Sequence, residues 1–381
     1  MRTKHPCQVC QSIKRNPVNM VMNLDARSCA QCYRERIGIS STARPPSTCV
    51  CGKPKSHTAN VCMQCYKKRG PTAEMQESIK QLVRQPLTSF EEAWALWQQT
   101  IGMAKNRYRG PAKAVPKKDR TRVLVIPDLH VPFEEPEMVA AMIAREAEQT
   151  DVAIQIGDIS DSYSLSRFAK YEPVSFAHEW AKVTLMMQTL SESFPVVKII
   201  VGNHDARLRK ALASQLTPDM LDAVTTMTGG TLCPVTALAK KFPNIEIASH
   251  EIPNSDHQVD WLMTYGDCLL AHPEKFSRVP GTAIRAFEEW VVDNANAMGI
   301  DGIRLFIMGH THALSFFPFR AGSLLVECGC LCKTQGYMTS ARIGGRPQRR
   351  GYVTFEQVKG VTDLNSVKIH WLDVEDGPWN S

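Results

Sequence analysis

From residue 121 onward, short apolar runs alternate with amphipathic stretches along the chain. Four runs have the length of buried strands, at 121–127 (TRVLVIP), 152–157 (VAIQIG), 196–202 (VVKIIVG) and 303–309 (IRLFIMG). Helical periodicity predicts helices at 136–149, 176–193 and 283–297, and further strands are expected near 245–249, 260–265, 268–271, 323–328, 351–357 and 366–372. Continuous apolar runs of strand length are typical of strands covered on both faces. The alternation therefore predicts a layered α/β domain over residues 121–375.

The residues before 121 follow a different pattern. Residues 1–70 are poor in large apolar side chains, and residues 71–104 read as a helical connector whose apolar face docks on a neighbouring surface. Ser89 and Glu92 form a possible capping box ahead of the apolar run in that connector. Residues 105–120 combine Pro, Gly and basic residues without periodicity, which is typical of a linker.

The spacing of the cysteines indicates that metal binding stabilises the first 70 residues. Eight of the 13 cysteines lie in four close pairs: Cys7 with Cys10, Cys29 with Cys32, Cys49 with Cys51, and Cys62 with Cys65. Two such pairs can supply four thiolates to one tetrahedral zinc. We therefore expect a basic zinc-finger-like region with two structural zinc ions. Reduced structural or redox thiols are the alternative for both groups, and more so for the second, whose Cys-x-Cys spacing is less common.

Charge is distributed very unevenly along the chain. Residues 1–70 hold 13 Lys and Arg against 2 Asp and Glu, and residues 105–122 hold 8 against 1. These two segments carry +18 within a net charge of +7, so the remainder carries −11. A basic module joined to an acidic body is typical of a nucleic-acid contact, although a solvated basic surface has the same composition.

Composition narrows the cellular setting. With 43% hydrophobic and 22% charged residues the chain resembles a globular protein, and no apolar run is long enough to span a bilayer. The N-terminus MRTKHPCQVCQSIKR lacks the apolar core of a signal peptide. We therefore expect a cytoplasmic protein without membrane contact, in the host cytoplasm if a phage encodes it. No repeat or heptad predicts an oligomeric state.

Candidate catalytic side chains stand directly after the apolar runs. They are Asp128 and His130 after the first run, Asp158 and Asp161 after the second, Asn203, His204 and Asp205 after the third, His272 after the run 268–271, and His310 and His312 after the run 303–309. Open α/β sheets bind ligands at the carboxyl ends of their strands. The joint occurrence of these residues therefore predicts one site.

In chain order these fragments read DxH, GDxxD, GNHD, H and GHxH. The pattern resembles that of the calcineurin-like metallophosphoesterase superfamily, and the resemblance covers nearly all of residues 121–375. It implies a two-sheet β-sandwich flanked by helices, with a dinuclear metal centre at one edge. By this resemblance Asp128, His130 and His312 hold one metal, Asn203, His272 and His310 hold the other, and Asp158 bridges both.

The chemistry of these residue types agrees with that assignment. A bridging carboxylate offsets part of the repulsion between two divalent cations about 3.5 to 4 Å apart. Mixed imidazole and carboxylate ligands suit Mn, Fe, Zn or Ni, and we expect manganese. Such a pair lowers the pKa of a shared water, so that hydroxide can attack phosphorus in line.

Catalysis also needs a proton donor for the departing oxygen. His204 is the motif histidine that the ligand set leaves free, and the resemblance places it beside the scissile group. Asp161 resembles the carboxylate that orients this histidine, with Asp205 as the alternative partner. Arg207 and Arg209 follow at once, and either contact substrate phosphate or lie on a solvated helix surface.

Two departures from the superfamily's protein Ser/Thr phosphatases narrow the substrate. Those enzymes carry GDxVDRG and LRGNHE, where this chain has GDISDSY and IVGNHDA. Ser162 replaces the arginine that grips phosphate, which argues against protein phosphatase activity. The stretch GDISDSYSLSRF followed by VGNHDARLRKAL instead looks like phage and bacterial phosphoesterases described as exonucleases of DNA repair.

Two further features lie near the end of the domain. Cys328, Cys330 and Cys332 alternate beside the GHxH motif, and we favour packing over an extra metal site for them. The basic stretch ARIGGRPQRRG contains Arg342, Arg346, Arg349 and Arg350, and it can line the path of a polyanionic substrate.

Three functions compete. The first is a nuclease or nucleic-acid phosphodiesterase, with DNA expected more than RNA. The second is a phosphomonoesterase or small-molecule phosphodiesterase whose zinc region binds a protein partner. The third is a scaffold without turnover, which the presence of all seven ligands and His204 argues against. The basic segments and the two cysteine clusters favour the nuclease, because a small-molecule hydrolase needs neither.

Overall fold

The computed structural model describes part of the chain. The described residues are 20–23, 26–29, 74, 76–78, 90–107, 119–166, 170, 172–255, 258–277, 279–320, 322–334 and 348–372. The chain divides into two compact units, Met1–Thr72 and Ala73–Ser381. They are described separately below.

The first unit contains an antiparallel hairpin of β1 (Met20–Asn23) and β2 (Ala26–Cys29), in which Met20 pairs with Cys29. Of the predicted zinc ligands, Cys29 is the last residue of β2. The other seven lie outside the described residues: Cys7, Cys10, Cys32, Cys49, Cys51, Cys62 and Cys65. Zinc binding by this unit therefore stays a prediction.

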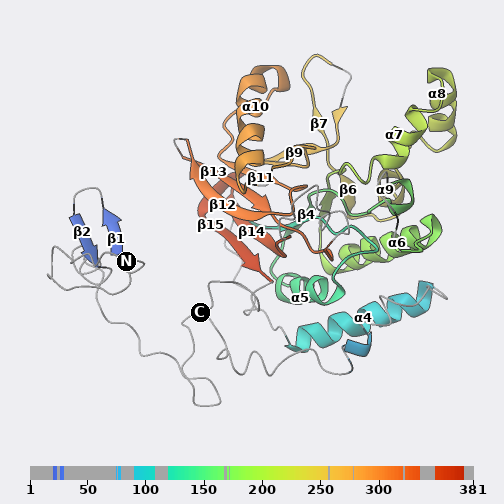
Figure 1. Cartoon of the computed structure of the whole chain (residues 1–381), viewed down its shortest axis with the longest axis horizontal. Helices are drawn as coiled ribbons and strands as arrows, with labels where there is room; N and C mark the ends of the chain where they lie inside the picture. The colour runs from blue at the N-terminus through green and yellow to red at the C-terminus, as the bar shows by residue number, and fades with distance from the viewer. Residues whose placement is uncertain are drawn as a thin grey trace. The chain divides into compact units, whose positions relative to one another are not determined.

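The second unit is built on two sheets (Figure 1). The six-stranded sheet has the order β15-β14-β3-β4-β5-β6, and its strands are β3 (Arg120–Ile126), β4 (Val152–Gln155), β5 (Val197–Ile199), β6 (Ile245–Ile247), β14 (Gly351–Val358) and β15 (Val361–Trp371). Strands β3 to β6 are mutually parallel, whereas β14 runs antiparallel to both β3 and β15. The parallel strands thus end at one common edge.

The five-stranded sheet has the order β12-β13-β11-β10-β9. Its strands are β9 (Leu262–Tyr265), β10 (Cys268–Ala271), β11 (Leu305–Met308), β12 (Leu314–Phe319) and β13 (Ser323–Cys328). Strands β10, β11 and β13 are parallel, and β9 and β12 close the sheet as antiparallel edges. A short separate pair joins β7 (His250–Glu251) to β8 (Gln258–Val259).

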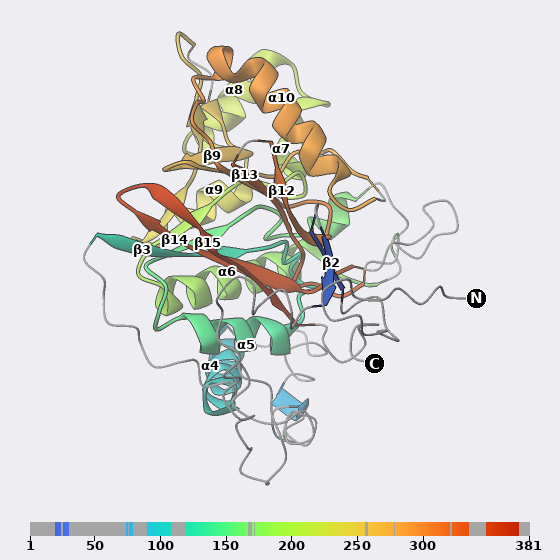
Figure 2. The ribbon, with the colours of Figure 1, turned by 90° about the vertical axis from the view of Figure 1, so that its left-hand side faces the viewer.

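Helices flank the two sheets, some directly and others by packing on further helices. They are α4 (Phe90–Arg107), α5 (Pro136–Glu146), α6 (Phe176–Ser193), α7 (Arg207–Ala213), α8 (Pro218–Met227), α9 (Pro234–Ala239) and α10 (Thr282–Met298), with a 3-10 turn η2 (Tyr163–Leu165). Figure 2 shows α5 and α6 beside the sheet that contains β3 and β14, and α10 on the opposite side, over β12 and β13. The domain is thus layered as helices, sheet, sheet and helix.

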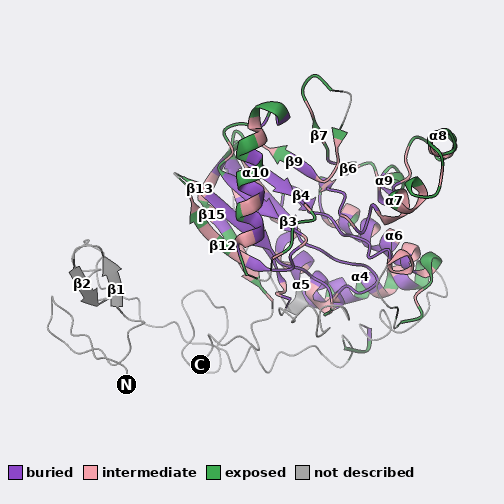
Figure 3. Cartoon of the chain, turned by 45° about the horizontal axis from the view of Figure 1, so that its top comes forward, coloured by how far each residue is buried: buried purple, intermediate pink, exposed green. Residues whose placement is uncertain are grey.

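The alternation of side chains along β3 explains why its sequence is apolar throughout. Leu124 and Ile126 pack into the core beneath α5 and α6, whereas Val123 and Val125 pack into the core between the sheets. All four side chains are fully buried, and each such burial contributes roughly 2 kcal/mol. A third core joins α10 to the outer face of the five-stranded sheet. Figure 3 shows the buried strands between more exposed helices.

Local signals in the sequence set several helix ends. Pro136 opens α5, where a missing backbone N–H costs nothing. Ser175 caps α6 by accepting a hydrogen bond from the backbone N–H of His178 at 3.2 Å. Gly299 ends α10 in the left-handed conformation that favours glycine.

Helix α4 forms an outer layer on α5 and α6. Its apolar stripe of Ala93, Trp97, Ile101 and Ala104 is buried in the same core as β3. The helical connector expected up to residue 104 thus contains a helix that begins at Phe90 and ends at Arg107. Its acidic first turn holds Glu92 of the predicted capping box, while Ser89 lies outside the described residues.

The two-sheet sandwich flanked by helices is the fold that the sequence predicts. All ten expected strands are present, and α5, α6 and α10 lie within about two or three residues of their predicted bounds. The sequence reading missed β12 and the short helices α7 to α9. Within the described residues, no helix combines the length and apolarity that crossing a bilayer requires.

Candidate active site

The motif residues meet where the parallel strands of both sheets end. Asp128 and His130 follow β3, Asp158 follows β4, Asn203 and His204 follow β5, His272 follows β10, and His310 and His312 follow β11. Hydrogen bonds cross from one sheet to the other here, two of them to or from the backbone. The backbone N–H of His310 donates to Asp128 Oδ2 at 3.1 Å, and Nδ1 of His272 lies 2.9 Å from the Ile156 carbonyl oxygen. Both sheets thus build one site.

One group of donors consists of Asp128, His130 and His312. Nε2 of His312 lies 3.0 Å from both Asp128 Oδ2 and His130 Nε2. Nε2 of His130 lies 3.9 Å from the same Asp128 oxygen. All three side chains are at most 4% exposed. Three donor atoms at these separations can contact one cation.

The second group consists of Asn203, His272 and His310. Oδ1 of Asn203 lies 3.2 Å from His272 Nε2 and 2.9 Å from His310 Nδ1. Donor atoms of His272, His310 and Asp158 all lie within 4.8 Å of one another. This group therefore has the composition and spacing of a second cation site.

Asp158 lies between the two groups. Its Oδ2 is 3.1 Å from His272 Nε2 and 3.6 Å from His130 Nε2. Its Oδ1 accepts the backbone N–H of His204 at 2.8 Å, which fixes the orientation of the carboxylate. Asp158 thus occupies the position from which one carboxylate can contact two cations.

Several of these residues have backbone conformations that few side chains adopt. His130, Asp158, His310 and His312 have φ values of 47°, 54°, 71° and 52°. Left-handed residues other than glycine cost of order 1–3 kcal/mol each and collect at functional sites. Each of these turns aims a side chain into the cluster immediately after its strand ends.

Glycine at position 202 is required by the close approach of two loops. A Cβ atom there would overlap the carboxylate oxygen and the backbone nitrogen of Asp158. Gly157 has a φ of 101°, and a Cβ at that position would lie 2.6 Å from His272 Nδ1. The glycines of the GD and GNHD motifs therefore make room for the donor groups.

Two histidines of the cluster have raised pKa values because negatively charged groups lie beside them. Burial opposes charge on His272, but Asp158 and Asp128 outweigh it and raise the pKa of His272 to about 10. Burial likewise opposes charge on His312, but Cys330 and Asp128 raise its pKa to about 9. Without a cation, both rings therefore carry a proton at neutral pH.

The protons on His272 and His312 lie where cations would bind. Burial would raise the pKa of Asp158, but the rings of His272 and His204 hold it well below its usual range. Carboxylates that stay ionised in a buried site need a positive partner, and a divalent cation displaces protons from imidazole ligands. The donor set therefore fits a pair of divalent cations.

The other two histidine donors are neutral. Burial and the proximity of His204 lower the pKa of His130, against the hydrogen bond with Asp161. Burial and the charge of His272 lower the pKa of His310 to about 4. Nδ1 of His130 lies 2.8 Å from Asp161 Oδ1, so its hydrogen points there and Nε2 keeps a lone pair toward the cluster.

His204 lies at the rim of the cluster and is held by Asp161. Its Nδ1 lies 3.0 Å from Asp161 Oδ1 and 3.0 Å from the Asp161 carbonyl oxygen. Its Nε2 lies 4.0 Å from Asp158 Oδ2 and accepts from Nη2 of Arg207 at 3.0 Å. His130, Asp158 and His204 are also close enough to hold an ion. The contact with Arg207 distinguishes His204 from the inward-facing rings.

Asp205 does not hold His204, contrary to the alternative that the sequence left open. Its Oδ2 accepts from the backbone N–H groups of Asp158 and Gly202 at 2.8 and 2.9 Å, and its Oδ1 accepts from Ser160 N at 2.9 Å. Burial and the charge of Asp158 raise the pKa of Asp205 to about 6. Asp205 thus ties the GD loop to the GNHD loop.

Glu179 is a functional contact that sequence reasoning missed. This buried residue of α6 accepts hydrogen bonds from the backbone N–H groups of Ser162 and Tyr163. Ser162 has a φ of 47°, and Glu179 holds that turn directly after Asp161. A charged residue on the apolar face of a predicted helix is the sequence signal that could have identified it.

The arginines proposed to contact substrate have different surroundings. Arg207 donates to the Asp161 carbonyl oxygen at 2.7 Å and lies beside His204. Arg209 is paired with Asp260 at 2.6 Å. Arg350 donates to the Cys332 carbonyl oxygen at 3.3 Å. The backbone N–H of Arg349 donates to the His312 carbonyl oxygen at 3.0 Å. Arg342 and Arg346 lie outside the described residues.

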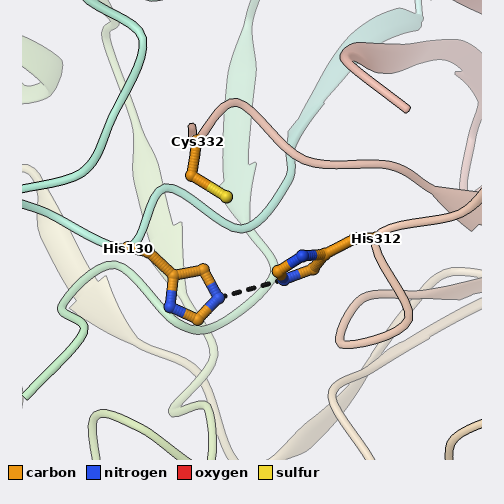
Figure 4. Close-up of side chains that lie close together, drawn as sticks. All are labelled: His130, His312 and Cys332. Atoms are coloured by element: carbon orange, nitrogen blue, oxygen red, sulfur yellow. Dashed lines mark hydrogen bonds between the residues drawn. The ribbon is translucent and has the colours of Figure 1, made fainter. Parts of the chain in front are cut away.

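A cysteine and a glutamine stand behind the first donor group. Sγ of Cys332 and ring nitrogens of His130 and His312 all lie within 4.8 Å of one another (Figure 4). Nε2 of Gln348 lies 2.5 Å from Nδ1 of His312. The sequence reading assigned Cys332 to packing and did not single out Gln348.

A two-sheet sandwich with imidazole and carboxylate donors at its shared edge defines a metal-dependent phosphoester hydrolase. Residues 121–314 match the family model described as calcineurin-like phosphoesterase, and the chain belongs to that family. The family fold implies divalent metals in the active site. A search of curated protein sequences finds no match to this chain.

Two solved structures are similar to this chain. Vps29 from Chaetomium thermophilum is 11% identical with a TM-score of 0.29, and the match covers 62% of this chain and 84% of that one. A protein serine/threonine phosphatase from Saccharomyces cerevisiae, with similarity to human phosphatase PP5, is 11% identical with a TM-score of 0.33. That match covers 77% of this chain and 95% of the phosphatase.

Proposed function

We propose that this protein hydrolyses phosphodiester bonds of nucleic acid at the metal centre between the two sheets. The observation that carries the proposal is the contact of His204 with Arg207 at 3.0 Å, at the rim of the donor cluster. A proton donor and a guanidinium at one rim suit a phosphoester, which offers both a charged oxygen and a leaving oxygen, and the basic segments of the chain favour the diesters of nucleic acid.

The two donor groups would hold the cations through the residues that the sequence indicated. Asp128, His130 and His312 would hold one, Asn203, His272 and His310 the other, and Asp158 both. Two divalent cations would supply Lewis acidity toward the phosphate oxygens and the attacking water. We infer manganese for this role, with iron, zinc or nickel as alternatives.

His204 supplies the proton that a poor leaving group needs. In the structure Nδ1 faces Asp161, so Nε2 is the nitrogen available for proton transfer. Asp161 keeps the ring in that orientation and stabilises its protonated form. A departing sugar oxygen, which is a strong base, gains more from this acid than a nitrophenolate does.

Arg207 links the binding of substrate to the availability of Nε2 of His204. Its guanidinium donates to Nε2 of His204, which holds that nitrogen as an acceptor. A phosphate oxygen is a stronger partner for the guanidinium than a neutral imidazole. When phosphate takes over Arg207, Nε2 becomes free to carry a proton. Arg207 thereby offers this site a guanidinium although Ser162 replaces the phosphatase arginine.

Nucleic acid is the substrate class that the charge distribution favours. The basic segments at 1–70 and 105–122 carry +18 together, and such charge binds a phosphate backbone by releasing counterions. We infer that the eight cysteines of the first segment hold zinc and so present its basic side chains as a folded surface. A protein partner for this region is the competing proposal.

A panel of substrates tests the proposal. The full-length protein with Mn²⁺ is incubated with single- and double-stranded oligonucleotides, bis-p-nitrophenyl phosphate and p-nitrophenyl phosphate. We expect cleavage of the oligonucleotides and of the diester. Asp158→Asn, purified in the same way, controls for contaminating nuclease. Hydrolysis of the monoester alone would overturn the proposal in favour of a phosphomonoesterase.

A further inference from the structure

Cys332 lies where a ligand of the first donor group would lie. Its sulfur is within 4.8 Å of ring nitrogens of His130 and His312, whose Nε2 atoms are 3.0 Å apart. In Figure 4 the Cys332 sulfur points toward the space beside the two facing rings. Tetrahedral zinc sites combine thiolate and imidazole donors in this way.

The backbone holds this thiol against the loop that carries Asp128 and His130. Leu331 N donates to the Asp128 carbonyl oxygen at 2.8 Å, and Lys333 N donates to the Phe133 carbonyl oxygen at 2.7 Å. These bonds flank Cys332 on both sides. The position of its sulfur relative to His130 is therefore fixed by the same loop.

Packing accounts for one neighbouring cysteine but not for Cys332. Cys328 is part of the apolar core between the two sheets. Cys330 and Cys332 are also fully buried, and neither belongs to the three apolar cores that the described residues form. Of these two thiols, Cys332 is the one whose sulfur lies within 4.8 Å of ring nitrogens of both His130 and His312.

Gln348 supports the same donor group from behind. Its side chain is 5% exposed, and its amide lies 2.5 Å from His312 Nδ1 and 3.8 Å from Cys332 Sγ. The amide oxygen can accept the Nδ1 hydrogen of His312, which keeps Nε2 of that ring toward His130 and Cys332.

We propose that Cys332 is a ligand of the divalent cation held by Asp128, His130 and His312. The metal–sulfur bond forms as the thiol proton leaves to solvent. The second donor group offers only nitrogen and oxygen ligands, so the two positions differ in the metal ions that they prefer. A thiolate favours Zn²⁺, Co²⁺ or Fe²⁺ over Mn²⁺ at the first position, so that the manganese of the proposed function is assigned to the second position. This inference rests on the dinuclear centre of the proposed function and not on the choice of substrate.

Cobalt absorption spectroscopy tests the inference on the full-length protein. The chain is stripped of metal, loaded with Co²⁺, and compared with Cys332→Ser at equal cobalt content. We expect the wild type to have additional sulfur-to-cobalt charge-transfer intensity, equivalent to one thiolate. Cysteines of residues 1–70 contribute equally to both spectra and cancel in the difference. The cobalt bound in excess of that in Asp158→Asn reports whether the centre forms at all, so its failure is distinguishable from the failure of the thiolate ligand.

Two neighbouring cysteines provide matched controls. Cys328→Ser and Cys330→Ser alter equally buried thiols and should keep the charge-transfer intensity. Loss of the intensity in Cys330→Ser instead, or identical spectra for wild type and Cys332→Ser, would overturn the assignment. If Cys332→Ser does not fold, cadmium NMR of the wild type decides. We expect a resonance from one sulfur with nitrogen and oxygen ligands, distinct from all-thiolate sites, and its absence contradicts the proposal.

Discussion

The rings of His130 and His204 lie edge to face with centroids 4.5 Å apart, and a single oxygen of Asp161 lies within hydrogen-bonding distance of both. Asp161 thus orients a metal-facing imidazole and the proposed general acid together. Because burial would raise its pKa, the hydrogen bonds from the two rings are what keep that pKa well below the usual range. The carboxylate therefore remains ionised throughout the neutral range.

Asp161→Asn should consequently weaken two functions at once. We expect kcat on oligonucleotides to fall by about 10²- to 10⁴-fold, as for loss of a general acid. Metal affinity should also fall by about 10- to 100-fold, because His130 loses its partner. His204→Ala is the matched variant, with a similar loss of kcat but full metal content. Elemental analysis alongside kinetics separates the two, and equal metal affinity in both variants would contradict the shared role.

Arg207 and Arg209 offer a direct comparison, because both follow the GNHD motif on α7. Arg207 contacts His204, whereas Arg209 is paired with Asp260. We expect Arg207→Met to lower kcat/KM on diesters by about 10- to 150-fold, the worth of one charge-assisted hydrogen bond to phosphate. Arg209→Met should change kcat/KM by less than about threefold, as for an exposed ion pair. Similar losses in both variants would show that Arg207 has no special position.

Gly202→Ala should disrupt the metal centre through sterics alone. The new Cβ would overlap Asp158, so the GNHD loop must move at a cost of about 1–3 kcal/mol. Gly102→Ala is the matched control, since a Cβ at that position of α4 meets nothing within 4 Å. It should stabilise the protein by about 1 kcal/mol. The thermal unfolding temperature and the metal content are measured for both variants. Full metal content in Gly202→Ala would refute the argument.

The sequence indicates which side chains lie together at the candidate site because each stands after a buried strand. Once β3, β4, β5, β10 and β11 run parallel within their sheets, the donors must meet at one edge. The sequence does not indicate which residues hold these donor side chains in position. Gln348 reaches His312 across a long stretch of chain, and Glu179 reaches Ser162 from α6. Such contacts depend on tertiary packing and leave no local periodicity.

The missed elements have equally physical causes. Strand β12 contains Pro318, and after its buried first residue it alternates between half-buried and exposed positions at the edge of its sheet. Helices α7, α8 and α9 are only 7, 10 and 6 residues long, which is too short for a helical pattern of apolar residues to repeat in the sequence. The zinc prediction for residues 1–70 rests on spacing alone and awaits direct measurement.

Glu179 should make stability depend on pH. Burial raises the pKa of Glu179 from 4.5 to about 7, so the folded state binds a proton more tightly than the unfolded chain does. Its contribution is therefore fully present below about pH 4.5 and is lost as pH rises through about 7, by roughly 3 kcal/mol. Glu179→Gln cannot ionise, so the variant should gain stability relative to wild type toward about pH 8. Denaturant titrations at both ends of this range test it, and a constant difference between the two proteins would exclude Glu179 as the titrating group.

Deleting residues 1–70 should weaken the binding of nucleic acid without changing the hydrolysis of small substrates. This segment carries 13 basic residues against 2 acidic ones, whereas the catalytic residues all lie after residue 121. Each phosphate contact that is lost should reduce the slope of log affinity against log salt concentration by about 0.9 on duplex DNA. Hydrolysis of bis-p-nitrophenyl phosphate should remain unchanged, because a small diester does not reach beyond the metal centre. An undiminished salt slope would place the nucleic-acid contact elsewhere, with the basic linker 105–120 as the next segment to neutralise. A lower rate on the small diester would instead indicate that the N-terminal segment supports the fold of the catalytic domain.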